Sequence, residues 1–151
     1  MYKFQIEKLK DIIEEIKPLL EDHWEEVAWY KDKIKLNPDY DKYLKIEELD
    51  MVVVVTVRYN DKLIGYNINF INTNLHYSDH VFAVNDIVFL HPNHRHSGVA
   101  LEMLSFTEEE LKNRGVSVVT FHMKLAHPFK TLMEQAEFSP QEYIYSKFIG
   151  G

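Results

Sequence analysis

Apolar residues recur at two different spacings along the first part of this chain. From Asp11 to Ala28 they return every three or four positions, which is typical of an amphipathic helix. Pro18 falls inside this pattern and cannot donate to the preceding turn, so we expect a kink there or the start of a second helix. Apolar and polar residues alternate over residues 2–9, which predicts a short strand, although the start of a helix is compatible with the same segment.

The clearest structural signal is a β-hairpin. Residues 52–57 and 63–70 are two β-rich runs, and the turn formers Asn60-Asp61 lie between them. Upstream of the hairpin, Asn37-Pro38 pairs a cap residue with a proline suited to the first helical position. This pair predicts a helix that runs to about Leu49.

After the hairpin, strand and helix patterns alternate. They predict a strand over residues 81–90 and an amphipathic helix over 101–112 that Gly115 ends. A buried strand over 116–123, a short helix over 128–136 and a last strand over 143–149 should follow. The order predicts an α/β fold in which helices cover both faces of a mixed sheet.

Composition narrows the class of protein. A chain of 151 residues is most economically one domain, 1–151, with 46% hydrophobic and 27% charged residues. The N-terminus lacks the apolar core of a secretory signal, and the longest apolar run, residues 51–55, is too short to cross a membrane. Without cysteine there is neither a disulfide nor an acyl-cysteine intermediate, which fits a cytoplasmic location. The net charge of −7 argues against non-specific binding to nucleic acid and mildly favours a cationic partner such as an amine.

The segment Arg95-His96-Ser97-Gly98-Val99-Ala100 has the composition of an anion site. It follows the apolar run 87–90 and opens the helix pattern that begins at Leu101. A helix N-terminus directs free backbone N–H groups and the positive end of its dipole at one point, which suits a phosphate or pyrophosphate. Gly98 allows a close approach of the backbone, and Arg95 adds a permanent positive charge.

The pattern Arg-x-x-Gly-x-Ala, with Pro92 three residues upstream, resembles the acetyl-CoA-binding motif of the GNAT superfamily of N-acetyltransferases. The predicted element order over about residues 50–150 is similar to the GNAT fold, a mostly antiparallel mixed sheet with helices on both faces. The resemblance implies that residues 95–100 hold the CoA pyrophosphate and that Val88, Phe89 and Leu90 pair with the pantetheine arm. The long polar connection around His76 is also similar to GNAT-like proteins of bacteriophages.

Asp86 is the candidate general base. It is an acidic residue in an otherwise apolar strand, and the resemblance places residues 85–89 on the strand where some GNAT enzymes carry a catalytic Glu. Partial desolvation would raise the pKa of this carboxyl toward the working pH. The alternative is that Asp86 points outward or pairs with a cation.

The acid that protonates the leaving thiolate is harder to place. Many GNAT enzymes carry a Tyr ahead of a Gly-Phe pair on the helix after the fifth strand, but here Met133 and Glu137 occupy the Tyr and Gly positions. Ala126 also stands where the family often has Asn. Tyr143 and Tyr145 are the candidate substitutes; otherwise they simply pack or cap the sheet, or the thiolate leaves unassisted.

Histidines supply further candidates. His91, His94 and His96 have a spacing that a metal could use, but without an evident fourth ligand we expect loop histidines near an anion and no metal. By the resemblance, His76 and Tyr77, with His80, lie where GNAT proteins often build the acceptor pocket, and His122 and His127 flank the meeting point of acceptor and thioester. The alternatives are polar surface for the former and structural histidines for the latter. Trp24, Trp29, Tyr30 and Tyr40 have the spacing of core aromatics and, in a GNAT fold, would also shape the acceptor side.

The sequence therefore predicts an acetyl-CoA-dependent N-acetyltransferase. Its acceptor would be an amine: a small molecule, a peptide N-terminus, a protein lysine and an amine-modified nucleobase all stay open. We expect no membrane partner, nucleic acid is disfavoured, and a homodimer is an open alternative. Two readings compete with it: a catalytically silent GNAT-fold module that binds CoA or a partner protein, and a metal-binding regulator that uses the histidine loop.

Overall fold

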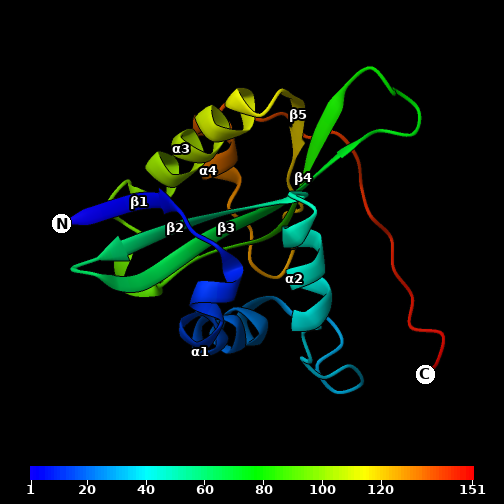
Figure 1. Ribbon diagram of the computed structural model, residues 1–151. Coiled ribbons are helices and arrows are strands. Elements are labelled where there is room, and N and C mark those ends of the chain that lie inside the picture. The colour runs from blue at the N-terminus through cyan, green and yellow to red at the C-terminus, as the bar shows by residue number, and fades with distance from the viewer.

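The computed structural model describes residues 1–151 and contains one five-stranded sheet. Neighbouring strands follow the chain in the order β1-β2-β3-β4-β5, and all pairs are antiparallel except the parallel pair β4–β5. Figure 1 shows α1 and α2 on one face of this sheet and α3 and α4 on the other. The strands are β1 Tyr2–Ile6, β2 Val52–Tyr59, β3 Lys62–Thr73, β4 Val81–Leu90 and β5 Val116–Thr120. The helices are α1 Leu9–Val27, α2 Tyr40–Glu48, α3 Val99–Asn113 and α4 Lys130–Gln135, with a 3₁₀ turn at Pro92–His94.

A core lies on each face of the sheet. Val52 and Val54 pack with Ile12 and Ile16 on the α1–α2 side, whereas Val53, Val55 and Val57 pack under α3. Successive side chains of a strand point to opposite faces, so a strand covered on both faces reads as the unbroken valine run of β2. The structure confirms the predicted fold class, a mixed and mostly antiparallel sheet with helices on both faces.

The hairpin forms as predicted around its turn. Asn60 and Asp61 both have positive φ, 48° and 68°. This is the backbone that a tight two-residue hairpin turn requires, and Asn and Asp tolerate it better than most residues. The end of α3 also agrees with the prediction, since Gly115 follows it at φ 81°.

The structure decides two points about the N-terminal helices. Of the two alternatives at Pro18, a kink or a second helix, the second does not occur, because α1 continues through Pro18 as one element. Pro18 lies on the exposed side, where water can satisfy the freed carbonyl, while Ile16 and Leu19 hold the other side against the sheet. Helix α2 begins at Tyr40 rather than after Asn37, because the Asp39 side chain accepts a hydrogen bond from Lys42 N (3.0 Å) and caps the helix there.

The C-terminal prediction is wrong. Residues 143–149 form no strand; they extend through an exposed tail, the red segment in Figure 1. Strand β5 ends at Thr120 rather than at residue 123, and α4 is shorter than residues 128–136. An alternating pattern gives a segment strand propensity, but a strand also needs a partner for its backbone groups, and none is supplied here.

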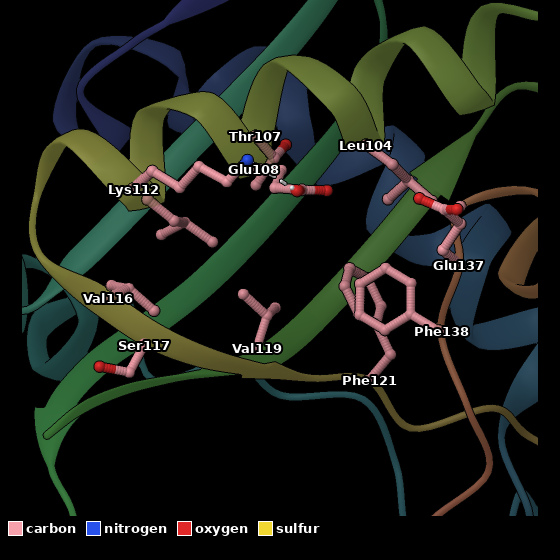
Figure 2. A pocket seen from close by; sticks show the side chains of 12 residues that line it. Leu104, Thr107, Glu108, Lys112, Val116, Ser117, Val119, Phe121, Glu137 and Phe138 are labelled. Atoms are coloured by element: carbon pink, nitrogen blue, oxygen red, sulfur yellow. Dashed lines mark ion pairs between the residues drawn. The ribbon is translucent and has the colours of Figure 1, made fainter.

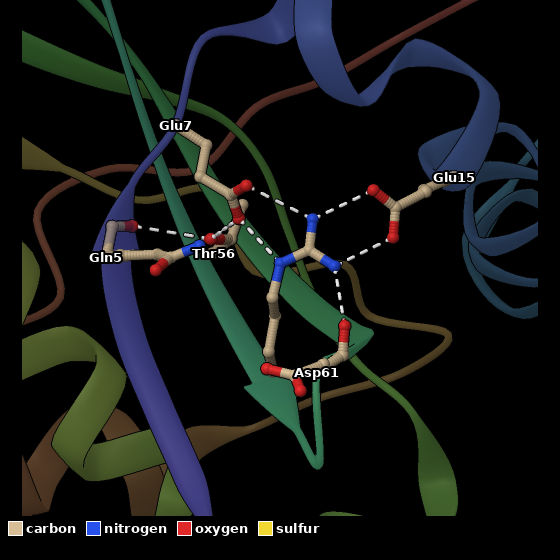
Figure 3. A network of polar contacts seen from close by, with 6 residues as sticks. Gln5, Glu7, Glu15, Thr56 and Asp61 are labelled. Carbon is tan, nitrogen blue, oxygen red and sulfur yellow. Dashed lines mark hydrogen bonds and ion pairs between the residues drawn. The ribbon is translucent and has the colours of Figure 1, made fainter.

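An ion cluster joins the edge of the sheet to α1 (Figure 3). Arg58 contacts Glu7 (Nε–Oε2 3.0 Å) and Glu15 (Nη1–Oε2 2.8 Å), and it also donates to the carbonyl of Asp61. Burial raises the pKa of Glu7, but hydrogen bonds from Arg58, Gln5 and Thr56 outweigh it and hold that pKa below its ordinary value. The cluster therefore fixes β1, β2 and α1 to one another. No helix of the structure is both long and apolar enough to span a membrane.

Candidate active site

The candidate site begins where β4 and β5 separate. Strand β5 pairs only with residues 81–84 of β4, while β4 continues to Leu90 with β3 as its single neighbour. Figure 1 shows the two strands diverging from their common end. Val88, Phe89 and Leu90 lie in the part of β4 that has no strand on the β5 side. The backbone edge of this part is therefore open to an extended ligand.

A β-bulge marks the point of separation. Across β3, Ile68 faces Ile87 and Asn69 faces Asn85, so Asp86 is an extra residue with no counterpart. One consequence is a break in alternation, since Asp86 and Ile87 both lie on the α1–α2 side. The bulge thus turns the Asp86 carboxylate into the layer between the sheet and α2.

The environment of Asp86 suits a carboxylate that exchanges a proton. Its Oδ2 accepts a hydrogen bond from the Tyr43 hydroxyl of α2, and no basic side chain forms an ion pair with it. Burial raises the pKa of Asp86 above its ordinary value, and the hydrogen bond from Tyr43 offsets part of this rise. Burial, and then the bond to Asp86, also raise the pKa of Tyr43. Of the sequence alternatives for Asp86, neither the outward orientation nor the cation pair occurs.

Two further polar side chains, His23 and Tyr66, lie on this side of the sheet, and the sequence pattern pointed to neither. His23 Nδ1 lies 3.0 Å from the Tyr66 hydroxyl, and the His23 ring stacks on Phe89 with a centroid separation of 5.4 Å. Burial lowers the pKa of His23 to about 4, so the imidazole is neutral at pH 7. A neutral histidine whose conjugate acid is that strong is a poor general base. Burial thus shifts the two groups in opposite directions, lowering the pKa of His23 and raising that of Asp86, which stays the candidate proton acceptor.

Three buried asparagines support the bulge from the α3 side. Asn85 Nδ2 donates to Asn67 Oδ1 (2.7 Å), to Asn69 Oδ1 (3.2 Å) and to the carbonyl of Ile68 (3.2 Å). Asn67 Nδ2 in turn donates to Thr107 Oγ1 of α3 (3.0 Å). The amide of Asn85 therefore ties the bulged part of β4 to β3. In the sequence, the available signal for these residues was the presence of asparagine in two otherwise apolar strands.

The predicted anion loop forms between β4 and α3. Gly98 is the N-cap of α3 with φ 78°, and no side chain caps the helix. A Cβ at Gly98 would meet nothing within 4 Å, so glycine is favoured here by its backbone conformation rather than by crowding. Ser97 and Gly98 are exposed, and Ser97 Oγ donates to the carbonyl of His94 (2.6 Å). The first-turn N–H groups at residues 98–101 are thus left for an external acceptor.

Arg95 is engaged away from those amides. Its Nη2 contacts Glu26 Oε1 of α1 (2.7 Å), and its Nε donates to the carbonyl of Leu90 (2.7 Å). His127 approaches both groups, 3.2 Å from Arg95 Nη1 and 3.2 Å from Glu26 Oε2. The positive charge expected at the loop is therefore balanced by Glu26, and Arg95 ties the loop to the end of α1. Its role toward a phosphate stays a prediction.

The other predicted residues are spread over the molecule. His76 and Tyr77 lie in the β3–β4 loop, at the opposite end of β4 from the anion loop, where Tyr77 stacks on Phe82. His122 is exposed just after β5. Tyr143 and Tyr145 are 87% and 92% exposed in the tail. Asp86, the β4 edge and the loop thus follow one another along the second half of β4, whereas His76 and Tyr77 lie at its other end and Tyr143 and Tyr145 lie in the exposed tail.

The histidine loop is held by other contacts. His94 Nδ1 lies 2.9 Å from the Tyr2 hydroxyl, and His91 Nδ1 accepts from Asn93 N. His96 is exposed. The three histidines are not gathered into a group that could hold a metal ion.

One cavity lies outside the candidate site. It has a volume of about 370 Å³ and lies between α3, β5 and the segment after α4 (Figure 2). Glu108, Lys112, Phe121 and Phe138 lie on its wall, together with residues of the paired part of β5. Because neither Asp86 nor the loop lines it, we leave it out of the site.

Comparison with known proteins places the chain. The model of the acetyltransferase (GNAT) family matches residues 10–128, most of the chain. The chain therefore belongs to the GNAT acetyltransferase family. No curated protein matches it in sequence.

Solved structures share its fold at low identity. An aminoglycoside acetyltransferase from an uncultured soil metagenomic sample, in complex with trehalose, superimposes with a TM-score of 0.77 at 12% identity, covering 99% of this chain and 95% of that one. Glucosamine-6-phosphate N-acetyltransferase from Arabidopsis thaliana gives 0.75 at 13%, with 99% of both chains covered. A predicted acetyltransferase with acetyl-CoA from Clostridium acetobutylicum gives 0.69 at 17%, covering 97% and 96%. These likenesses show the fold alone.

Proposed function

We propose that this protein transfers an acetyl group from acetyl-CoA to a primary amine by direct attack within a ternary complex. The observation that carries the proposal is the single strand β4, whose open edge ends in the Gly98-capped helix and whose bulge presents Asp86. Membership of the GNAT acetyltransferase family and the neighbour with acetyl-CoA support the choice of donor.

The residues present fit such a donor. The N–H groups at the start of α3 would bind the pyrophosphate, and the open edge at Val88, Phe89 and Leu90 would pair with the pantetheine arm. A backbone N–H of this edge would polarise the thioester carbonyl as negative charge develops on its oxygen. The fixed strand thus serves to orient the acetyl group toward the amine.

In the proposed transfer, the amine nitrogen attacks the thioester carbon, a C–N bond forms and the C–S bond breaks. The amine must lose one proton, and Asp86 is the proposed acceptor, directly or through one water. The thiolate takes up one proton. Tyr143 and Tyr145 stay the proposed donors, although both lie in the exposed tail, and solvent is the alternative source.

Binding of acetyl-CoA tests the loop. Gly98→Glu should abolish it, because a carboxylate would stand against the pyrophosphate and occupy the helix N-terminus. Gly115→Glu is the matched control, since Gly115 has nearly the same backbone (φ 81°), is equally open and lies at the other end of α3. Calorimetric titration with acetyl-CoA would measure both. Equal affinities for Gly98→Glu and the control would overturn the loop assignment.

The second candidate function is a silent module that binds CoA without turnover. It is favoured by Met133 on α4, in the position where the family often has Tyr, and by the exposure of both tail tyrosines. Thiol release from acetyl-CoA with a panel of amines separates the two functions. Binding of CoA with background release for every amine would support the silent module.

A further inference from the structure

A groove lies beside the hydrogen-bonded pair formed by Tyr43 and Asp86. It has a volume of about 420 Å³ and lies between α1, the connection 34–39 and α2, with the sheet as its floor. Ile87, the residue next to Asp86, lies on that floor, and Tyr43, which donates to the Asp86 carboxylate, lies on the wall. Asp86 itself does not line the groove, but two of the lining residues, Ile87 and Tyr43, are its direct neighbours.

The walls of the groove are apolar. Most of the lining residues are apolar: Leu9, Ile16, Leu20, Trp24, Ile34, Leu36, Pro38, Ile68 and Ile87. The charged lining residues are Lys35 and Asp39, and the Asp39 carboxylate already caps α2 through Lys42 N (3.0 Å). Almost all acidic residues of this chain thus lie outside the groove. The groove therefore favours a ligand with an apolar body over a polycation or a phosphorylated sugar.

The size of the groove suits a small molecule. A cavity of about 150 Å³ lined by Leu, Ile and Phe takes up benzene. A groove of about 420 Å³ has room for one or two rings with a short chain. Trp24 and Tyr40 also line the groove. Each has a lysine ammonium over one face of its ring, Lys31 at 5.7 Å and Lys17 at 5.5 Å, so a ligand ring would stack on the opposite face.

We propose that the amine acceptor is a small arylalkyl or alkyl amine, whose apolar body lies in this groove and whose amino group reaches Asp86. The proposal rests on the proposed acetyltransferase function and narrows it to a substrate class. This class differs from the aminoglycoside and the sugar phosphate for which two of the structural neighbours are named.

Specificity constants test the proposal. Phenethylamine and hexylamine should be acetylated with kcat/KM values about tenfold or more above those of spermidine, glucosamine 6-phosphate and an aminoglycoside. Leu36→Lys places a charge in the groove and should lower kcat/KM for phenethylamine about tenfold or more. Leu49→Lys is the control, because Leu49 is an exposed leucine just after α2 that does not line the groove. Preference for the polar amines, or an equal effect of both variants, would overturn the substrate class.

A binding readout keeps this test separate from turnover. Trp29 does not line the groove, so Trp29→Phe leaves Trp24 as the single tryptophan and a reporter of its occupancy. Phenethylamine should quench Trp24 saturably, and Leu36→Lys should weaken this quenching. Saturable quenching without acetylation of any amine would contradict the proposed function and support the apolar ligand. Turnover of polar amines without quenching would support the function and overturn the apolar ligand.

Discussion

The two halves of β4 have the same neighbour on one side and different surroundings on the other. Residues 81–84 pair with both β3 and β5, whereas residues 85–90 pair with β3 alone. The first half is ordinary sheet, and its backbone groups are satisfied within the fold. The second half combines an open edge with the bulge at Asp86, and it ends at the Gly98 loop. Within one strand, the structure thus separates a part that stabilises the fold from a part left free for a ligand.

The largest effect expected from this comparison is on catalysis. Asp86→Asn keeps the size of the side chain and removes its basicity, so kcat should fall about 10²-fold or more. Affinity for acetyl-CoA should stay close to wild type, because the loop and the β4 edge are untouched. Steady-state kinetics with the best amine, together with calorimetry for acetyl-CoA, would measure this. A normal kcat would remove Asp86 as the base.

The same substitution should stabilise the protein at neutral pH. Because the pKa of Asp86 is raised in the folded state, the protonated form is favoured there, and stability is lost as pH rises through that pKa. An amide at this position avoids ionising a buried group. Thermal unfolding of wild type and Asp86→Asn should therefore give a higher Tm for the variant at pH 7, with a smaller difference near pH 4. An unchanged difference between the two pH values would contradict the desolvation of Asp86.

The next effect concerns the support of the bulge. Asn85→Ala leaves Asn69 Oδ1 and the carbonyl of Ile68 without the amide that now donates to them, which should cost about 2–3 kcal/mol of unfolding free energy. Asn72→Ala is the control, because Asn72 is exposed and faces Phe82 in the fully paired half. Urea denaturation would measure both. Similar small losses would mean that the asparagine cluster does not hold the bulge.

A smaller effect is expected on the pH dependence of the reaction. Tyr43→Phe removes the hydrogen bond that favours the charged form of Asp86, so the pKa of Asp86 should rise further. The acidic limb of the kcat/KM profile should then move to higher pH, with activity recovered at alkaline pH. Tyr40→Phe, one turn away and without a bond to Asp86, should leave the limb in place. A shift in both variants, or in neither, would show that the acidic limb does not report the ionisation of Asp86.

The smallest effect is expected in the paired half. Val84 is 39% exposed and precedes Asp86 by two residues, but β4 is paired on both sides there. Val84→Thr keeps the β-branched shape, so stability should change by about 0.5 kcal/mol or less, and turnover should stay near wild type. A large loss of turnover would break the division of β4 into a structural half and a ligand half.

Much of the architecture was predictable from local patterns. The hairpin at Asn60-Asp61, the strand that carries Asp86 and the helix that follows Gly98 each depend on neighbouring residues and on turn chemistry. What local patterns left open or got wrong has tertiary causes. The helix continues through Pro18 because that residue faces water, and the predicted last strand is wrong because residues 143–149 lack the partner that their alternation requires.

The site was predictable in part. Asp86 and the loop could be singled out as candidates because an acid in an apolar strand and a glycine before a helix are local signals. Tyr43, His23 and Tyr66 were not, since their roles arise only when α1 and α2 pack on the sheet. The pairing of Arg95 with Glu26, a residue far away in sequence, could not be foreseen for the same reason. The proposed roles of His76, Tyr77, His122, Tyr143 and Tyr145 stay predictions.

Because of the bulge, β4 is one residue longer than regular pairing with β3 requires. If Asp86 were deleted, Asn85 and Ile87 would become neighbours opposite Asn69 and Ile68, and their side chains would already point to opposite faces. Regular alternation would return without any other side chain changing sides. A single-codon deletion should therefore yield an unbroken sheet of nearly the same fold that has lost its acid. On this strand, one inserted residue therefore carries the proposed general base.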